Sequence, residues 1–173
     1  MKILQKVALG GGCHWCTEAV FQSLVGVECV HQGWATHIES DNGFSEAALI
    51  EYTPEIIELD VLIEVHLLTH SSTSNHSMRN KYRSAIYVTH AEQERNVTEV
   101  LASLKENFSE PLQTQILPLI GFKSNPKYQN YYYQNPNRTF CQRYINPKLL
   151  LMLERFPEKV KRDKVNAALS EDG

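Results

Sequence analysis

Three glycines followed by two closely spaced cysteines constrain this chain more than any other stretch. The string GGGCHWC covers residues 10–16, directly after the apolar residues 7–9 and directly before the helix-like residues 17–21. We therefore expect a strand, a glycine turn and then Cys13 at the start of a helix. Unpaired backbone N–H groups and the positive end of the helix dipole favour a thiolate over a thiol at such a position. Cys13 is the candidate nucleophile.

Cys16 lies three residues further on, so on a helix it shares nearly the same face and can attack an oxidised Cys13. The same spacing also occurs in zinc sites, and the two thiols could instead be buried and inert. Zinc requires two further ligands, whereas Cys29 and Cys141 are single and distant in sequence. The glycines argue against inert thiols, because they permit a ligand to approach the backbone closely. Redox chemistry is the favoured interpretation, and no metal is expected.

The composition is that of one ordinary globular domain. The chain has 173 residues, of which 42% are apolar and 21% charged, and a net charge of −3 without a basic block. We expect a single domain over residues 1–173, with a core at about 6–147 and a C-terminal helix and tail at about 148–173. The charge gives no electrostatic case for nucleic acid, and no apolar run suits a signal peptide or a membrane span. We expect a cytoplasmic protein whose cysteines stay reduced unless they cycle in catalysis.

Hydrophobic periodicity and turn residues predict alternating strands and helices without an internal repeat. The predicted strands cover residues 6–9, 27–34, 44–52, 82–88 and 113–119, and the predicted helices cover 13–24, 59–68 and 91–108. A polar loop at 69–81 and an aromatic-rich segment from residue 125 onward complete the pattern. Two strand–helix–strand units that share one sheet predict an α+β fold. We expect a ferredoxin-like split βαβ core with a mixed or antiparallel sheet, helices on one face and an irregular C-terminal segment.

Four ordered motifs resemble the A-type peptide methionine sulfoxide reductases. They are GGGCHWCTEAVFQSLVGV, FSEAALIEYTPEII, KYRSAIY and KYQNYYYQNPNRTFC, and together they extend over roughly residues 6–147. In that family a cysteine attacks the sulfur of an S-epimer methionine sulfoxide, a glutamic acid protonates the departing oxygen, and tyrosine hydroxyls hold that oxygen. Thioredoxin usually restores the dithiol. The resemblance implies no metal and no organic cofactor, only an external reductant, thioredoxin or another dithiol.

The resemblance assigns roles to four residues. Cys13 matches the nucleophile, Trp15 the tryptophan of the methyl pocket, Glu46 the acid and Tyr82 an oxygen-binding tyrosine. A sulfoxide oxygen leaves only after protonation, so the carboxyl beside Cys13 must stay neutral near pH 7, which burial against Trp15 favours. Without the resemblance, Glu46 is most simply a solvated strand residue, and Trp15 and Tyr82 are as readily core residues.

Three positions depart from the family pattern. His14 stands where the family has phenylalanine, Trp34 where a tyrosine supplies a second hydroxyl, and Ser77 near the usual aspartate of the substrate pocket. The indole N–H of Trp34 can still donate one hydrogen bond. We expect His14 to tune the polarity of the pocket or surface and not to act as a base or metal ligand, because neighbours on a helix point about 100° apart. The departures affect substrate range and rate and spare the nucleophile and the acid.

Two cysteines are candidates for resolving an oxidised Cys13. Cys16 is close in sequence, and Cys141 lies in a segment similar to the family's stretch with a recycling cysteine; the order of their action stays open. Cys29 is expected to be a packed thiol. His66, His70 and His76 are expected to cap helices and hydrogen-bond loops.

The resulting expectation is a cytoplasmic repair enzyme that reduces methionine S-sulfoxide in proteins, with the free amino acid as a further candidate substrate. Its expected partners are oxidised proteins or peptides and thioredoxin, and it is expected to be a monomer. Two alternatives stay open: a general dithiol–disulfide oxidoreductase, and a binding module for sulfoxides or a partner with little turnover.

Overall fold

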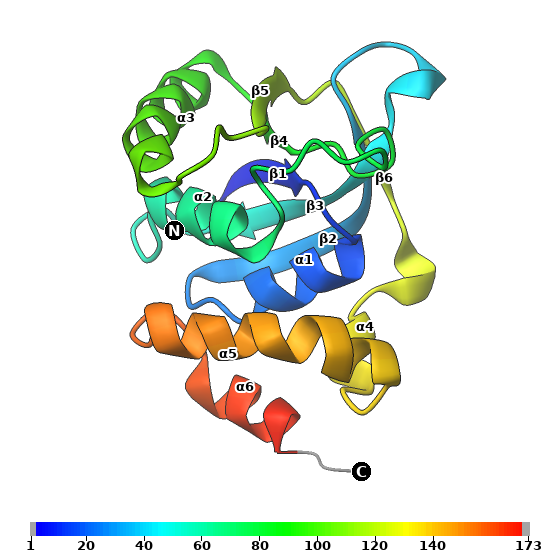
Figure 1. Ribbon diagram of the computed structural model, residues 1–173, viewed down its shortest axis with the longest axis vertical. Coiled ribbons are helices and arrows are strands. Elements are labelled where there is room, and N and C mark those ends of the chain that lie inside the picture. Colours follow the sequence, from blue (N-terminus) through cyan, green and yellow to red (C-terminus); the bar gives the residue numbers. More distant parts are fainter. Residues whose placement is uncertain (1–2, 171–173) are drawn as a thin grey trace.

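A computed structural model describes residues 3–170 of the chain, and its centre is one six-stranded sheet (Figure 1). The strands are β1 (Gln5–Gly10), β2 (Val27–Thr36), β3 (Ser45–Tyr52), β4 (Ala85–Val88), β5 (Gln115–Pro118) and β6 (Gly121–Ser124). The helices are α1 (His14–Gln22), α2 (Leu59–Thr69), α3 (Ala91–Leu104), α4 (Tyr131–Gln134), α5 (Asn146–Arg155) and α6 (Arg162–Leu169). Within a few residues, these confirm most of the predicted strands and helices.

The sheet confirms the expected split βαβ core. Its strand order is β5-β4-β1-β3-β2-β6, and the four central strands are antiparallel, with α1 between β1 and β2 and α2 between β3 and β4. At one edge β5 runs parallel to β4, because the long crossover through α3 brings the chain back in the same direction. The sheet is therefore mixed.

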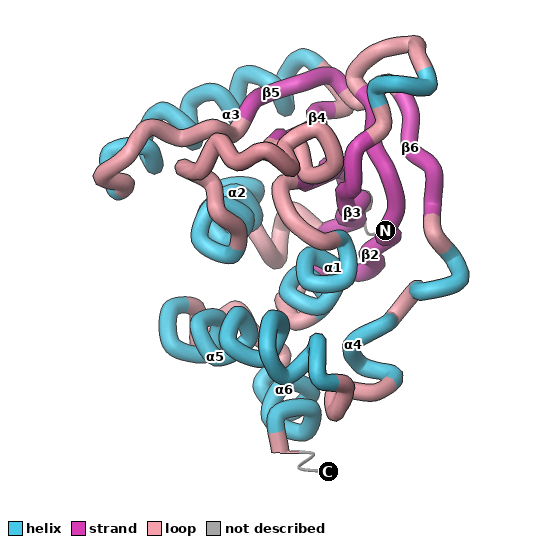
Figure 2. The backbone as a smooth tube through the Cα atoms, turned by 45° about the vertical axis from the view of Figure 1, so that its right-hand side comes forward, coloured by secondary structure: helices cyan, strands magenta, loops and turns pink. Residues whose placement is uncertain are grey.

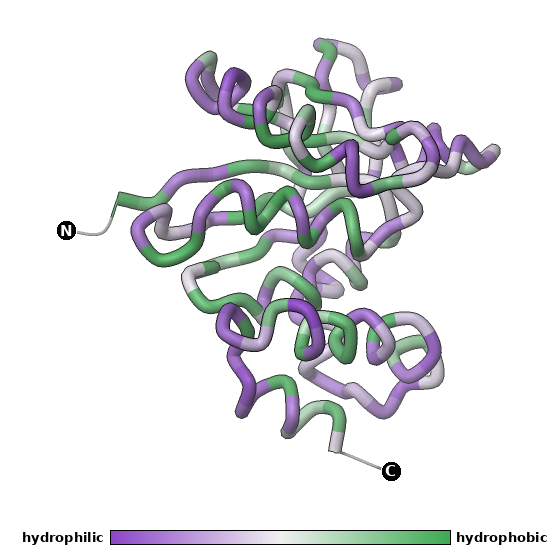
Figure 3. Tube along the Cα trace, turned by 60° about the vertical axis from the view of Figure 1, so that its left-hand side comes forward, coloured by the Kyte–Doolittle hydropathy of each residue, from purple (hydrophilic) through white to green (hydrophobic). Residues whose placement is uncertain are grey.

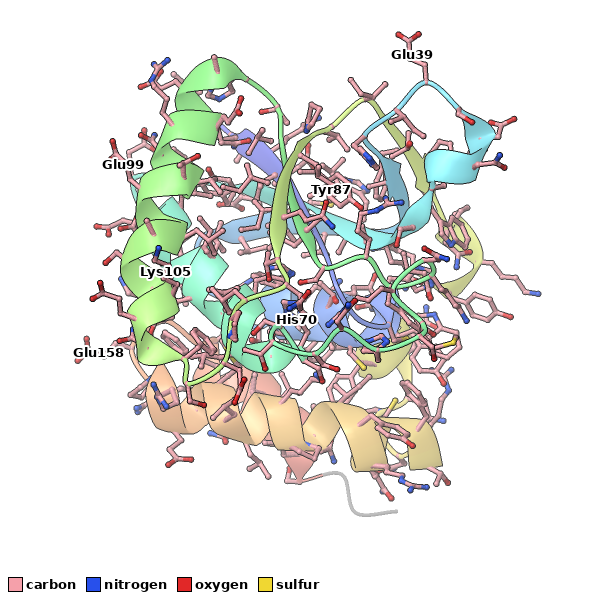
Figure 4. The ribbon with its side chains drawn as sticks, turned by 45° about the horizontal axis from the view of Figure 1, so that its top comes forward. Glu39, His70, Tyr87, Glu99, Lys105 and Glu158 are labelled. Atoms are coloured by element: carbon pink, nitrogen blue, oxygen red, sulfur yellow. The ribbon has the colours of Figure 1, made fainter. Side chains whose placement is uncertain are left out.

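The helices α1 and α2 cover one face of the sheet, which Figure 2 shows on one side of the strands. That face carries the main core, to which each strand contributes alternate apolar residues such as Val7 and Leu9 of β1. In Figure 3 apolar residues run along the strands through the middle of the molecule. The opposite face holds a smaller cluster around Tyr87, which points inward in Figure 4, whereas Glu99 and Lys105 point outward.

The C-terminal part is more ordered than the sequence predicts. The expected irregular segment contains the single turn of α4 and a π-helical turn at Cys141–Ile145 that runs directly into α5. The strand β6, directly before this segment, was not predicted. Pro147 sits in the first turn of α5, where its missing N–H costs nothing. The helix therefore begins slightly before the expected position.

A buried carboxylate fixes this segment to the core. Glu18 of α1 is fully buried and accepts hydrogen bonds from the backbone N–H groups of Asn130 and Tyr131 and from the amide of Gln32. Burial raises the pKa of Glu18, and these three donors oppose that effect. The aromatic segment is thereby held against the start of α1.

The predicted strand 82–88 is wrong at its beginning, because β4 starts only at Ala85. The preceding residues are bound to β3 instead: the hydroxyl of Ser45 accepts from the N–H of Arg83 and donates to the carbonyl of Lys81. These bonds bring the loop before β4 next to Glu46, whose N–H donates to the same carbonyl at 3.0 Å.

His66 joins α2 to the end of β1 and makes folding stability depend on pH. Its Nε2 donates to the carbonyl oxygen of Gly10 at 2.7 Å, and burial lowers the pKa of His66 to about 4. Because the folded pKa lies below the unfolded value of 6.5, this contribution is present above pH 6.5 and is lost as the pH falls toward 4.

We expect His66→Gln, whose neutral amide can still donate, to remove this dependence. Between pH 7 and 4.5 the unfolding free energy of the wild type should fall by about 2.5 kcal/mol more than that of the variant. Urea unfolding at the two pH values measures both. An equal decline in the two proteins would contradict the assignment.

Candidate functional site

The turn from β1 into α1 places Cys13 at the first turn of the helix. The carbonyl of Cys13 accepts hydrogen bonds from the N–H groups of Cys16 and Thr17 at 3.1 and 3.2 Å, so the residue caps α1. Gly11 has φ +147°, and a Cβ there would lie 2.4 Å from the His70 ring. Only glycine fits this turn without strain, which explains part of the glycine run.

Cys13 is the sulfur that ionises more readily of the two. A hydrogen bond from the Cys16 thiol lowers the pKa of Cys13, and the backbone N–H groups of Trp15 and Cys16 add to this against the effect of burial. The same bond raises the pKa of Cys16, since Cys16 is the donor. The sequence predicts that the start of the helix lowers the pKa of Cys13. The pKa is lowered, and the hydrogen bond from Cys16 is the largest cause.

Cys13 opens onto a groove of about 350 Å³. Its lining comes from the glycine turn, the start of α1, the loop before β4 and the C-terminal segment, and includes Cys13, Cys16, His70, His76, Met78, Tyr82, Phe140, Tyr144 and Lys148. The groove thus brings together Cys13, Cys16 and Tyr82, as the sequence predicts. It has room for a side chain the size of an oxidised methionine.

Glu46 lies on β3 and is buried, with an exposed fraction of 7%. Its Oε1 is 3.3 Å from Nε2 of His14, which is itself buried. Among the described residues its Oε2 has no hydrogen-bond partner, and the Lys81 ammonium is 3.9 Å away. The negative charge of Glu46 raises the pKa of Cys13, although Glu46 does not line the groove itself.

His14 is oriented by both of its ring nitrogens. Nδ1 lies 2.9 Å from the carbonyl oxygen of Gly33, and a carbonyl only accepts, so Nδ1 carries a hydrogen. Nε2 of His14 then faces Oε1 of Glu46. Sequence reasoning expected a residue that tunes polarity and gave no sign of this contact, because the pairing depends on the register of β2 and β3.

Of the other predicted binding residues, Trp34 lies beside His14, whereas Trp15 packs against the C-terminal segment. The ring of Trp34 lies 5.3 Å from that of His14. Trp15 stacks on Tyr131 with ring centroids 4.1 Å apart and meets Phe140 edge-on at 5.5 Å. An aromatic wall from the C-terminal segment therefore covers Trp15.

Ser77 lies apart from the other predicted residues. Its side chain is exposed, and its neighbours His76 and Met78 line the groove while Ser77 does not. A binding role for Ser77 stays a prediction.

Cys141 is buried close to the two cysteines of the motif. All four cysteines are free thiols, and the charge of Cys141 acts on Cys16. Burial raises the pKa of Cys141, while the nearby Arg138 guanidinium opposes this. The structure therefore places Cys16 in contact with Cys13, and Cys141 near Cys16.

Lys148 is a site residue that sequence reasoning missed. It lines the groove from the first turn of α5, its Nζ donates to the carbonyl of Thr69, and its charge acts on both Cys16 and Cys13. Burial lowers the pKa of Lys148. Nothing in the sequence indicates that Lys148 lies near the cysteines, because a single lysine in an amphipathic helix is usually solvated.

The expectation that His66 and His70 make structural hydrogen bonds is confirmed. His70, labelled in Figure 4, bonds to the carbonyl of His66 and, at 2.8 Å, to the hydroxyl of Ser84. The expectation that Cys29 is a packed thiol is wrong: it is half-buried and lies 3.4 Å from Nε2 of His31. A bulge in β2 beside Val27 shifts its register and presents Cys29 on the open face of the sheet.

Comparison with known proteins agrees with this geometry. The model of the family described as peptide methionine sulfoxide reductase matches residues 5–160. The peptide methionine sulfoxide reductase MsrA of Chromobacterium violaceum is 34% identical over 170 residues, covering 88% of this chain and 97% of the relative.

Solved structures share the fold. Mxr1 from Saccharomyces cerevisiae in reduced form has a TM-score of 0.69 at 19% identity and covers 80% of this chain and 89% of its own. Mxr1 in complex with Trx2 gives a TM-score of 0.60 at 18% identity, covering 74% and 84%. Within residues 3–170, no helix combines the length and apolar character needed to cross a membrane.

Proposed function

We propose that this chain, which belongs to the peptide methionine sulfoxide reductase family, reduces the S epimer of methionine sulfoxide in proteins and peptides to methionine. The observation that carries the proposal is the pairing of Cys13 with a buried carboxyl. Cys13 is activated by the Cys16 thiol and opens onto a groove, and Glu46 is a buried carboxyl whose charge influences Cys13. An attacking sulfur and a proton donor are the two groups that sulfoxide reduction requires.

In the proposed first step the Cys13 thiolate attacks the sulfoxide sulfur while Glu46 delivers a proton to the oxygen. The S–O bond then breaks and the hydroxyl passes to Cys13, which becomes a sulfenic acid as methionine leaves. The sulfoxide sulfur gains two electrons and the Cys13 sulfur loses two. Tyr82, in the groove beside Cys13, can donate its hydroxyl hydrogen to the oxygen.

The next steps restore the thiol. Cys16 is in contact with Cys13, so we propose that its sulfur attacks the sulfenic sulfur, forms a Cys13–Cys16 disulfide and releases water. Cys141, whose charge acts on Cys16, can then exchange with this disulfide. The positive charge of Lys148 favours Cys16 as a thiolate during the attack.

An external dithiol must supply the two electrons, and we propose thioredoxin for this role. The fold shared with Mxr1, which has been solved in complex with Trx2, supports it. The proposed steps use only thiols and one carboxyl, so they need no bound cofactor. Free thiols suit a reducing compartment such as the cytoplasm. Reduction of free methionine sulfoxide and a monomeric state stay predictions.

The proposal is tested by reduction of separated S and R epimers of a methionine sulfoxide peptide, driven by a dithiol. The wild type should turn over the S epimer only, Cys13→Ser should abolish turnover, and Glu46→Gln should slow it by about 100-fold or more, as expected for loss of a general acid. Lys81→Gln, which removes the exposed neighbour of Glu46, serves as a matched control and should retain most activity.

A folded, reduced wild type that turns over neither epimer would overturn the proposal. Reduction of a disulfide substrate by that same protein would then favour the general dithiol–disulfide oxidoreductase.

We also propose that His14 positions the Glu46 carboxyl. The Gly33 carbonyl holds Nδ1 of His14, which directs Nε2 toward Oε1 of Glu46. A phenylalanine at the same position could not make this polar contact.

His14→Phe should therefore lower kcat/KM for the S epimer by roughly tenfold, because the Glu46 carboxyl loses the contact that holds it. In a Glu46→Gln background the same substitution should cause little further loss. Equal kcat/KM for the wild type and His14→Phe, both folded, would show that His14 only packs against Trp34.

A further inference from the structure

A second group of chemically active side chains lies on the face of the sheet away from α1. Cys29 and His31 alternate along β2 and so point to the same side, and Glu51 of β3 is paired directly with Cys29. All three are partly accessible, with exposed side-chain fractions of 40% for His31 and 19% for Glu51. Along β3, Glu51 is five residues from Glu46 and on the opposite face, about 17 Å away. The group is separate from the groove.

The three ligand atoms converge on one point. The Cys29 Sγ lies 3.4 Å from Nε2 of His31, the same Nε2 lies 3.1 Å from Oε2 of Glu51, and all three atoms are within 4.8 Å of one another. In a tetrahedral zinc site with Zn–S near 2.3 Å and Zn–N and Zn–O near 2.0 Å, neighbouring ligand atoms are roughly 3.3–3.6 Å apart. Both measured separations are within about 0.3 Å of these values.

The convergence differs from that of an activated thiol. In a nucleophile–base–carboxylate relay the thiol and the carboxylate contact opposite nitrogens of the imidazole. Here Sγ and Oε2 both approach Nε2. Both contacts share one imidazole nitrogen, so the three atoms cluster at the same edge of the His31 ring.

Lys6 orients the carboxylate from the other side. Its Nζ lies 3.2 Å from Oε1 of Glu51, which leaves Oε2 directed at His31. A charged partner on the outer oxygen holds the ligand oxygen in place, as outer hydrogen bonds do around metal ligands.

From this arrangement we propose that Cys29, His31 and Glu51 form a binding site for a divalent zinc-class cation that joins β2 to β3. Thiolate, imidazole and carboxylate together suit Zn²⁺, and three protein ligands leave a fourth position for water or an external ligand. The sequence predicted no metal site, because the three residues meet only through the strand register and the bulge in β2. The bound cation would also mask the Cys29 thiol.

The test is titration of the reduced, full-length protein with Zn²⁺ against a chromophoric chelator. The triple variant Cys13→Ser, Cys16→Ser, Cys141→Ser removes every other thiol and should still bind one Zn²⁺. Adding Cys29→Ser, His31→Gln or Glu51→Gln to it should weaken binding by at least about tenfold. Glu55→Gln, which removes an exposed carboxylate just after β3, is the matched control for Glu51→Gln and should leave the affinity unchanged.

Co²⁺ gives a second readout that a folding defect would not imitate. The triple variant loaded with Co²⁺ should show a thiolate-to-cobalt charge-transfer band in the near ultraviolet, and Cys29→Ser should lose it while its circular dichroism is unchanged. A triple variant that binds no Zn²⁺, or binding that is insensitive to Cys29→Ser, would overturn the proposal and leave the group as a hydrogen-bonded cluster.

Discussion

The thiol of Cys16 donates a hydrogen bond to the sulfur of Cys13 at the first turn of α1, and the rest of the site is arranged around that pair. The bond requires the glycine turn after β1, which brings the chain into the helix with Cys13 as its cap. The hydrogen bond makes the two cysteines different: it lowers the pKa of the acceptor Cys13 and raises the pKa of the donor Cys16. The neighbour that activates Cys13 is also the group placed to capture its oxidised form.

The register of β2 and β3 positions the residues that contact His14. Glu46 and Trp34 are cross-strand partners on β3 and β2, and Gly33 beside Trp34 offers the carbonyl that orients His14. A helix residue and a strand residue thus meet in a buried contact behind Cys13. The docked C-terminal segment, held by Glu18, completes the enclosure with Tyr131 and Phe140 around Trp15. Helix start, strand register and segment docking are separate local features that together build the surroundings of Cys13.

Much of this could be predicted from the sequence, because it depends on local signals. The glycine run marks the turn, the alternating apolar residues mark β3, and the resemblance to the family is what assigns Cys13, Glu46 and Tyr82 to one site. What could not be predicted depends on contacts between distant segments. The His14–Glu46 contact requires the register of β2 and β3, the approach of Lys148 requires the docking of α5, and the exposure of Cys29 requires a bulge that no turn residue signals.

The central claim is that Cys16 activates Cys13, and the pH dependence of Cys13 alkylation, followed peptide by peptide by mass spectrometry, tests it most directly. In the wild type the midpoint should lie below 9.0, the ordinary value of a cysteine thiol, and in Cys16→Ala it should rise toward that value. Cys141→Ala, which removes a thiol that is not hydrogen-bonded to Cys13, should leave it unchanged. A wild-type midpoint at or above 9.0, or one that Cys16→Ala does not move, would contradict the account.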